Sequence, residues 1–335
     1  MLYIPFDQLV STLTAALEKA GFDTPRAARL ADVFARNSLE GVYSHGVNRF
    51  PRFLGEIENG IVRLDTQPET VASLGGMEVW DGRFGPGPLI AEQAMGRAVA
   101  LAAQHGIACV SVRCTNHWLR PGRYGLAAAD AGMAAILFTN TSGNMPAWGA
   151  VDPRLGNNPI VLAVPRKKGH ILVDMAMSQF AYGKLEVAAL SGKKLPIPGG
   201  FDQDGNLTDD PAAILDSHRI LPTGYWKGAA MSLALDCMTA ALSMGRTVSV
   251  IRRDSLPERG LSQVFIAFNF RALVDPDTVD RLLDEELDDL LGSTPAPGAE
   301  PVRYPGQNRE AIVRENLSRG VPVNEQTWEK IVGKN

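Results

Sequence analysis

The sequence predicts an α/β protein of α+β character, with a central mixed sheet and a discontinuous helical part. Segments with helical spacing of apolar residues cluster near both ends of the chain, while short strand-like segments occupy its middle. The two kinds of segment do not alternate regularly, which argues against a doubly wound parallel sheet. With 335 residues, the chain is long enough for two or three domains. We expect a mainly helical part from residues 1–115 and 305–335, and a central sheet from residues 116–304.

Three helices are predicted at the start of the chain. The first, residues 6–20, repeats leucine at helical spacing and is followed by Gly21, which suits a helix end. The second, residues 24–41, opens with a threonine followed by proline, a residue favoured at the first helical position. The third covers residues 47–58. A segment near residue 45 is therefore expected at the N-terminus of this third helix or just before it.

Strands are predicted where short apolar runs stand between polar or turn-forming residues. They cover residues 77–80, 107–113, 134–140, 160–164, 171–175 and 264–270. The second to fifth of these runs are typical of buried strands. An alanine-rich helix, residues 89–104, separates the first two strands.

The later helices differ in composition. Residues 227–243 are nearly all small or apolar, so we expect this helix to be buried. Residues 276–291 form an acidic helix, and the Pro/Ala/Gly-rich residues 293–300 form a flexible connection. Two short helices complete the chain.

Charge and cysteine content narrow the class of protein. The formal net charge is -4, which favours neither nucleic acid nor an acidic membrane surface as a partner. Cys109, Cys114 and Cys237 cannot all pair within one chain, and we expect free thiols in a reducing, cytoplasmic setting. The N-terminal segment lacks a signal-peptide pattern, and no run approaches the roughly 18 apolar residues of a membrane helix.

The segment of residues 41–53 carries the strongest chemical signal, because it places His45 four residues before Arg49. On a helix this spacing puts both side chains on one face. A guanidinium can hold a carboxylate through two oxygens, and an imidazolium can donate a proton near neutral pH. Reduction of a 2-keto acid needs both groups besides a hydride source. Ser44 could bind the substrate or hold the imidazole. Alternatively, His45 is a capping or core histidine and Arg49 faces solvent.

A second histidine, His117, follows the predicted strand at residues 107–113, where loops present polar groups to ligands. It could line a substrate pocket, or its hydrogen bonds could hold the loop in place. His45, His105 and His117 lack the close spacing of metal ligands, and no carboxylate cluster accompanies them. We therefore expect no metal site.

The glycines near residue 85 do not match the glycine pattern of a dinucleotide-binding fingerprint. Gly85 and Gly87 would be its first two glycines, but the third position holds Ile90. Pro86 and Pro88 also remove backbone donors from this stretch. We interpret the segment as a loop that starts a helix.

Two further segments suit a ligand site. Asp174, at the end of the strand 171–175, could orient the imidazole, accept hydrogen bonds from a cofactor ribose, or tie down a neighbouring loop. At the start of the helix 227–243, Lys227 could meet a phosphate and Trp226 could pack on a flat ring. Alternatively, Trp226 is a packing anchor and Lys227 a solvated surface residue.

Several motifs together resemble the type-2 malate/L-lactate dehydrogenase family. They are Tyr43-Ser-His-Gly-Val-Asn-Arg-Phe-Pro-Arg-Phe53, Asn116-His-Trp118, Pro146-Ala-Trp-Gly149, Gly156-Asn-Asn-Pro159, Val173-Asp-Met175 and Leu221-Pro-Thr-Gly-Tyr-Trp-Lys-Gly228. The resemblance extends from Phe6 to Trp328, and the first and last runs point to a branch that reduces a sugar-derived keto acid. Asn157, where that branch commonly has threonine, departs from the pattern. Pro121, Arg123 and the pair Gln307-Asn308 also depart from it.

The resemblance implies a non-Rossmann, NAD(P)-dependent dehydrogenase fold with a mixed, largely antiparallel sheet. It implies that His45 donates the proton and that Ser44 and Arg49 bind the substrate, within a homodimer whose active site lies near the subunit interface. The cofactor-binding residues are expected to be His170, Ile171, Leu172, Val173, Asp174, Met175, Ala176, Trp226, Lys227, Gly306, Gln307 and Asn308. The helical part would then hold the substrate and catalytic residues, and the sheet part the cofactor. The expected cofactor is NADH, with NADPH as the alternative.

The predicted function is reduction of a 2-keto acid, with hydride from NAD(P)H and a proton from His45, or the reverse oxidation of a 2-hydroxy acid. One alternative is a dehydrogenase of malate, L-lactate or another 2-hydroxy acid in the same family. The other is a catalytically silent dinucleotide-binding protein. A small keto or hydroxy acid is the expected partner, and neither nucleic acid nor a membrane is expected.

Overall fold

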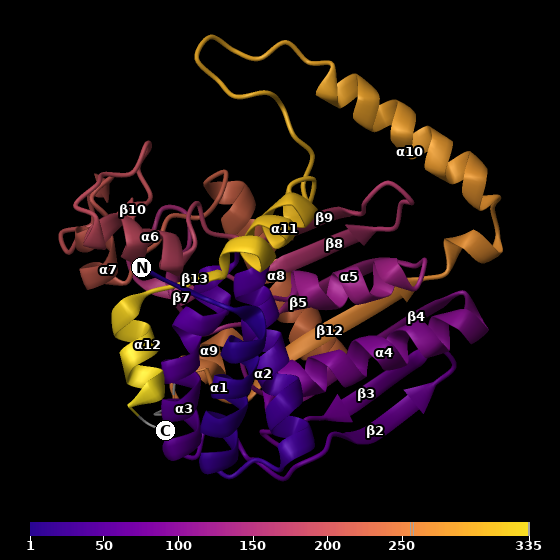
Figure 1. Cartoon of the computed structure of the whole chain (residues 1–335), viewed down its shortest axis with the longest axis horizontal. Coiled ribbons are helices and arrows are strands. Elements are labelled where there is room, and N and C mark those ends of the chain that lie inside the picture. The colour runs from indigo at the N-terminus through magenta and orange to yellow at the C-terminus, as the bar shows by residue number, and fades with distance from the viewer. Residues whose placement is uncertain (255, 257, 334–335) are drawn as a thin grey trace.

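A seven-stranded sheet forms the centre of the computed structural model, which describes residues 1–254, 256 and 258–333 (Figure 1). Its strand order is β2-β3-β4-β12-β5-β8-β9. The bounds are β2 Glu69–Leu74, β3 Met77–Asp81, β4 Ile107–Thr115, β12 Leu261–Phe268, β5 Ala134–Thr139, β8 Ile160–Val164 and β9 Ile171–Met175. β3 and β4 pair in parallel, while the other neighbouring strands of this sheet are antiparallel. The prediction of a mixed, largely antiparallel sheet is therefore confirmed.

One face of the sheet is covered by α4 (Gly87–His105) and α5 (Gly122–Asp130). A parallel pair needs a crossover connection, and α4 provides it between β3 and β4. Side chains alternate along a strand, so Val110 and Val112 of β4 point to this face and pack into a core with Phe265 of β12. Tyr124 of α5 is buried in the same core, and its hydroxyl donates to the carbonyl of Trp118 at 2.7 Å.

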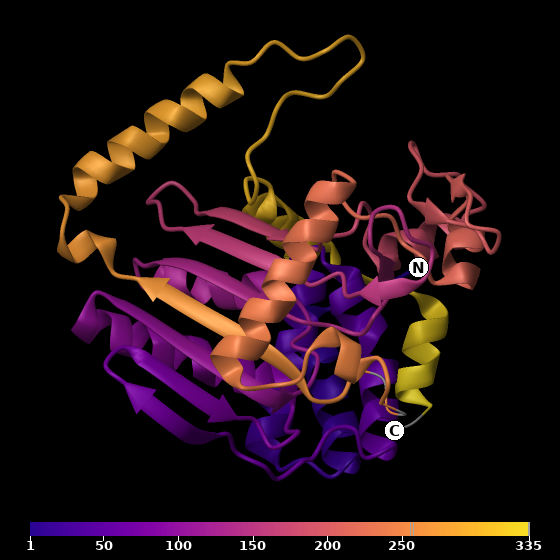
Figure 2. The ribbon, with the colours of Figure 1, turned by 180° about the vertical axis from the view of Figure 1, so that it is seen from behind.

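The opposite face is covered by α8 (Trp226–Ser243), which crosses the sheet in Figure 2. One side of this helix, including Leu235 and Thr239, is buried. Its other side is open, with Met231, Leu233 and Met238 each about half exposed. The expectation of a fully buried helix is thus wrong for this chain. The helix forms the outer layer on this face of the sheet, so one of its sides is open. Because its residues are apolar on all sides, its sequence does not indicate which side stays exposed.

The two ends of the chain meet in the helical part (Figure 1). It contains α1 (Phe6–Lys19), α2 (Thr24–Leu39), α3 (Phe50–Glu58), α11 (Arg309–Arg319) and α12 (Glu325–Val332). Strand β1 (Leu2–Ile4) pairs antiparallel with β13 (Val321–Val323). Asn316 of α11 donates to the carbonyl of Leu39 at 2.8 Å. Phe34 and Phe50 pack edge to face inside this part, with ring centroids 5.1 Å apart. The helical part is therefore discontinuous in sequence, as predicted.

The expected boundary at residue 115 needs correction. Residues 69–115 supply β2, β3, α4 and β4, which belong to the sheet layer. Because the parallel pair β3–β4 is closed by α4, this whole segment stays with the sheet. The N-terminal helices of the helical part end with α3 at Glu58.

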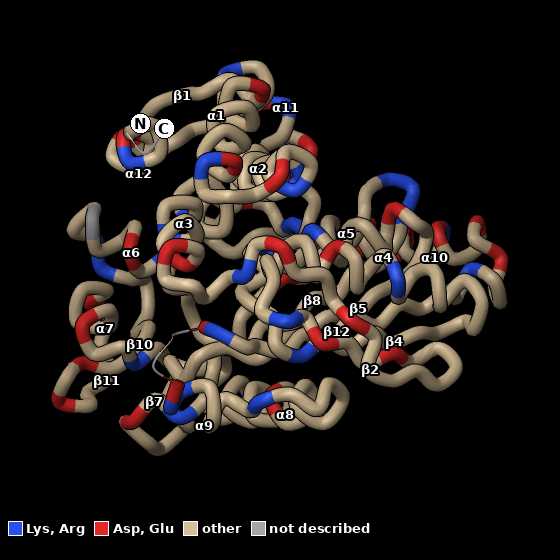
Figure 3. Tube along the Cα trace, turned by 90° about the horizontal axis from the view of Figure 1, so that it is seen from below, with Lys and Arg blue, Asp and Glu red and all other residues tan. Residues whose placement is uncertain are grey.

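The remaining elements are short or peripheral. They are η1 (Tyr43–His45), η2 (Val47–Arg49), β6 (Met145–Pro146), β7 (Pro153–Leu155), α6 (Tyr182–Leu190), β10 (Gly200–Phe201), β11 (Leu207–Thr208), α7 (Pro211–Ser217), α9 (Val248–Ile251), η3 (Phe270–Ala272) and α10 (Pro276–Leu291). The acidic α10 stands away from the main body in Figure 1, and Figure 3 colours acidic residues near its label red. Its Asp284 pairs with Arg166 and Lys168 of the β8–β9 turn, at 2.5 and 2.7 Å. Within the described residues, no helix has the length and apolarity needed to cross a membrane.

Candidate active site

The segment that carries His45 and Arg49 forms two short 3-10 turns immediately before α3, as the sequence predicted. The end of α2 holds it in place. Asn37 donates to the carbonyl of His45 at 2.8 Å, and Ser38 Oγ accepts from the amide of Val47 at 2.9 Å. A glycine is required between the turns, because a Cβ at Gly46 would lie 2.1 Å from Ser38 Oγ. The backbone around the histidine is therefore fixed by α2.

His45 and His117 face each other in this site. Their rings are nearly parallel, with centroids 5.7 Å apart and an interplanar angle of 14°. Ser44 Oγ lies 3.1 Å from Nδ1 of His45. Nδ1 therefore already has a hydrogen-bond partner that can orient the ring. His117 Nδ1 accepts from the amide of Leu119 at 3.0 Å. His117 thus holds its own loop, which was one of the two interpretations, and its ring lies against that of His45.

Both histidines are neutral near neutral pH in the protein alone. Burial and the nearby charge of Arg49 lower the pKa of His45 from its usual value to about 4. Burial, again aided by Arg49, lowers the pKa of His117 well below its usual value. The expectation that His45 is readily protonated near neutral pH is therefore corrected. A proton on His45 has to be stabilised by something that binds in the site.

Arg49 is held by two carboxylates that the sequence analysis missed. Its Nη2 lies 2.5 Å from Glu258 Oε2 and 3.4 Å from Glu56 Oε1. Arg52 joins the same cluster, at 3.2 Å from Glu56 and 2.7 Å from Glu258. Glu56 could have been found from its helical spacing to Arg52. Glu258 lies far along the chain, where no local pattern indicates the contact.

Asp174 does not orient the imidazole. It lies at the exposed end of β9, the outermost strand of the sheet, and its Oδ2 accepts from the amide of Gly122 at 2.8 Å. It thereby ties down the start of α5, which was one of the three interpretations. The hydrogen-bond partner of the His45 ring is Ser44 Oγ, and not Asp174 as one interpretation had it. The strand was also expected to be buried, but only Leu172 of β9 is, because an edge strand has an open side.

Of the three segments predicted to bind the cofactor, one is β9 and the other two lie near its opposite ends. Near its start, Leu172 donates to the carbonyl of Pro305 at 3.0 Å, which places the turn at Gly306 beside His170. Beyond its end, Met177 accepts from the amide of Thr223 at 2.9 Å, three residues before Trp226. A shallow pocket of about 260 Å³ is lined by the same C-terminal turn, residues 306–308.

Some polar groups in these segments are already engaged. His170 Nδ1 accepts from the amide of Arg166 at 3.1 Å, and its Nε2 lies 2.9 Å from Asp130. Gln307 Oε1 accepts from the amide of Tyr304 at 3.1 Å. In contrast, Trp226 is 61% exposed at the start of α8. The exposed indole is thus open to a ligand, whereas His170 and Gln307 shape the surrounding turns.

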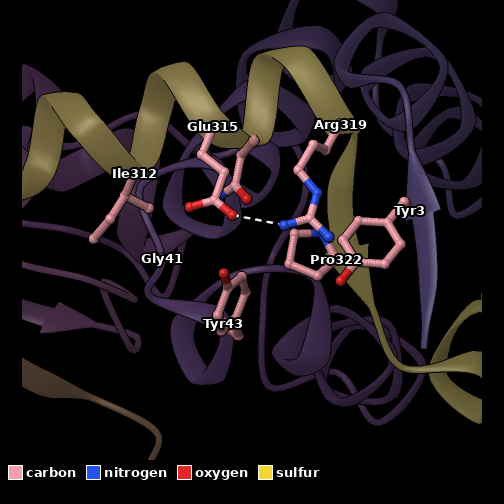
Figure 4. A pocket seen from close by; sticks show the side chains of 8 residues that line it. Tyr3, Gly41, Tyr43, Ile312, Glu315, Arg319 and Pro322 are labelled. Carbon is pink, nitrogen blue, oxygen red and sulfur yellow. Dashed lines mark hydrogen bonds and ion pairs between the residues drawn. The ribbon is translucent and has the colours of Figure 1, made fainter.

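A larger pocket of about 310 Å³ lies between α11 and the segment before His45 (Figure 4). Gly41 and Tyr43 line it from one side, and the ion pair of Arg319 and Glu315 from the other. Neither His45 nor Arg49, the two residues predicted to act on the substrate, lines this pocket. Among the described residues, no group of three or more side chains is arranged to hold a metal ion.

Comparison with known proteins shows the family of the chain. A model of the malate/L-lactate dehydrogenase family matches residues 4–332. The chain belongs to this family. It is 43% identical to the 2,3-diketo-L-gulonate reductase of Shigella boydii serotype 4 over 328 residues, or 98% of each chain.

Solved structures show the same family fold. Sulfolactate dehydrogenase from Methanocaldococcus jannaschii is 28% identical, with a TM-score of 0.90 over 99% of this chain and 96% of that one. Malate dehydrogenase from Pyrococcus horikoshii OT3 is 25% identical, with a TM-score of 0.90 over 99% and 94%. This member of the malate/L-lactate dehydrogenase family is therefore an oxidoreductase of the hydroxy- and keto-acid class, which uses a nicotinamide cofactor.

Proposed function

We propose that this family member reduces 2,3-diketo-L-gulonate, with His45 as proton donor and Arg49 as the group that binds the carboxylate. The observation that carries the proposal is the placement of both side chains on one short segment, held against α2 and facing His117. The substrate is supported by the 43% identity to reductases of that name over nearly the whole chain. The substrate was also the one expected from the motifs.

Arg49 has donors left for a substrate carboxylate. Both of its ion pairs use Nη2. In the described part of the chain, its Nη1 and Nε make no hydrogen bond with another side chain, so each can donate to a substrate oxygen. Each two-oxygen fork of a guanidinium includes Nη2, so a carboxylate bound through both oxygens shares Nη2 with Glu258 and Glu56. A fixed carboxylate sets which carbon of the substrate receives hydride, and such orientation contributes several kcal/mol, within the roughly 7–11 kcal/mol available to well-placed reactants.

Substrate binding also raises the pKa of His45, so that its ring can carry the proton that reduction needs. The charge of Arg49 is one of the causes that lower the pKa of His45 to about 4. A substrate carboxylate placed on Arg49 offsets this charge, so the pKa of His45 rises in the complex. The protonated imidazole then gives its proton to the carbonyl oxygen as reduction proceeds. In the reverse reaction the neutral ring accepts the hydroxyl proton.

Residues of β9 and near its ends fit a nicotinamide cofactor, which when bound supplies the hydride. The exposed indole of Trp226 can pack on a flat ring, and Lys227 beside it can meet a phosphate. We propose NADH rather than NADPH. This preference follows from the resemblance of the motifs to those of the family.

We also propose a homodimer in a reducing, cytoplasmic setting. The open side of α8 carries Met231, Leu233 and Met238, an apolar surface of the kind that monomers seldom leave exposed. The three cysteines Cys109, Cys114 and Cys237 are free thiols, as expected for a reducing setting.

A substrate panel followed through NADH absorbance tests the proposed function. Turnover of 2,3-diketo-L-gulonate at a kcat/KM above that of oxaloacetate and pyruvate supports it. Faster turnover of the simple keto acids would assign the chain to the malate or lactate dehydrogenases of the family. Binding of NADH without turnover of any keto acid would identify a catalytically silent dinucleotide-binding protein.

A further inference from the structure

Glu258 is a charged group inside the substrate site that the chemistry described so far does not use. Its Oε2 lies 2.5 Å from Nη2 of Arg49 and 2.7 Å from Nη2 of Arg52. Its side chain is only 19% exposed. The positive charge of Arg49 and its neighbours lowers the pKa of Glu258 to about 2, although burial acts in the opposite direction. Glu258 is therefore an anion throughout the pH range of enzyme assays.

The backbone directs this carboxylate toward Arg49. Glu258 adopts a positive φ of 56°, a left-handed conformation that few residues other than glycine take without cost. Its amide donates to Ser142 Oγ at 3.2 Å. The next residue, Arg259, lies over the ring of Phe84 at 4.4 Å from the centroid. The strained conformation is thus anchored on both sides, which is typical of a residue placed for function.

The charges in this cluster cancel before any substrate binds. Arg49 and Arg52 contribute two positive charges, and Glu56 and Glu258 two negative ones. Glu186 of α6 adds a further negative field at Arg49. A substrate with one carboxylate can bind the nitrogens of Arg49 that remain available. A second anionic group on the same substrate would lie close to the carboxylate of Glu258, beside a cluster whose own four charges already balance.

We propose that Glu258 restricts the substrate to 2-keto acids with a single negative charge and an uncharged, hydroxyl-bearing tail. This inference rests on the proposed function. Hydroxyl groups can donate hydrogen bonds to a carboxylate, whereas a second carboxylate or a sulfonate is repelled by it. Glu258 thus acts as a specificity-determining residue: it holds Nη2 of Arg49 and rejects dianions.

The test compares hydroxypyruvate, a monoanion with a hydroxyl, with oxaloacetate, a dianion. kcat/KM is measured for both with saturating NADH in the wild type and in Glu258→Gln, which keeps the shape and removes the charge. The ratio of kcat/KM for oxaloacetate to that for hydroxypyruvate should rise about tenfold or more in Glu258→Gln, equivalent to about 1.4 kcal/mol. Glu258→Asp keeps the charge and should keep the ratio near the wild-type value. Glu315→Gln, which removes a similar pair with Arg319 on α11, is the matched control and should not change it.

Use of the ratio separates specificity from positioning. If both kcat/KM values fall together in Glu258→Gln and the ratio is unchanged, Glu258 only positions Arg49 and the inference is overturned. If the wild type reduces neither compound nor 2,3-diketo-L-gulonate, the proposed function itself fails. If Glu258→Gln does not fold, inhibition of the wild type decides: glycerate, a monoanion with a hydroxyl tail, should inhibit hydroxypyruvate reduction more strongly than the dianion malate, and the reverse order would overturn the inference.

Discussion

The imidazole of His45 lies parallel to that of His117, with ring centroids 5.7 Å apart. The two rings come from different layers of the molecule, His45 from the turn after α2 and His117 from the loop after β4. The contact places the predicted proton donor where the helical part meets the end of the sheet. His117 shields one side of the His45 ring, which contributes to the burial that keeps both histidines neutral.

Replacement of His45 by alanine should abolish most of the reductase activity. General acid catalysis contributes about 100- to 10,000-fold, so kcat should fall by a factor in this range. Affinity for NADH, measured by fluorescence titration, should stay close to that of the wild type, because the segments proposed to bind the cofactor are β9 and those near its ends. An equal loss of cofactor affinity would contradict the proposed division of roles.

The two reaction directions should differ in their pH dependence. The pKa of His45 is about 4 in the free protein, and reduction needs the protonated ring. kcat/KM for keto-acid reduction should therefore decrease steadily as the pH rises from 5 to 8. kcat/KM for hydroxy-acid oxidation needs the neutral ring, which is already present, so it should vary little with the state of His45 over this range. Steady-state rates at each pH provide the measurement, and an inflection near 6.5 in both directions would argue against the low pKa.

The reductase activity should be sensitive even to replacement of Arg49 by another cation. Lysine keeps the charge but lacks the planar fork that binds two oxygens at once. Arg49→Lys should raise the KM for the keto acid and lower kcat, and Arg49→Ala should do so more strongly. Initial rates at varied keto acid and varied NADH separate the effects. A rise in the KM for NADH as large as that for the keto acid would mean that Arg49 does not serve the substrate alone.

Lys227 provides the complementary test on the cofactor side. Lys227→Ala should raise the KM for NADH while the KM for the keto acid changes little, because the residue is proposed to meet a phosphate at the start of α8. Lys193→Ala, which removes an exposed lysine from the turn after α6, is the control. Identical kinetics of the two variants would remove Lys227 from the cofactor site.

Acid should destabilise the fold partly through His45. Its pKa is about 4 in the folded protein and roughly 6.5 in the unfolded chain, so the unfolded state binds more protons between these values. The contribution to the free energy of unfolding is complete above pH 6.5 and is lost as the pH falls toward 4. Urea unfolding at several pH values should show a shallower decline in His45→Gln than in the wild type. An unchanged slope, matching that of the exposed control His105→Gln, would contradict this contribution.

Local patterns in the sequence were sufficient to predict most of the framework of helices and strands. Helices α1 and α2 and the strands β4, β5, β8 and β12 have apolar periodicity or apolar runs that reflect their own burial. β2 was missed because all six of its residues are exposed, so burial leaves no apolar pattern in it. α5 was missed because it is short and because Pro121, just before it, and Gly122, its first residue, together usually indicate a turn.

The candidate site was predictable only in its local part. His45 and Arg49 could be paired because they lie on one short segment, and Ser44 precedes them directly. The carboxylate of Glu258 reaches Arg49 across a sequence separation of 209 residues, through tertiary contact alone. The low pKa of His45 likewise depends on burial and on charges that the fold assembles. Such relationships follow from packing and have no local signature.

A crystal structure with NADH and oxamate would show whether His45 and Arg49 meet the substrate. The measurement is the distance from each side chain to the bound keto-acid analogue. We expect His45 Nε2 within about 2.6–3.2 Å of the oxygen that corresponds to the substrate carbonyl. We also expect the carboxylate of the analogue on the guanidinium of Arg49. If the complex instead shows either side chain pointing away from the ligand, the proposed roles of His45 and Arg49 are wrong.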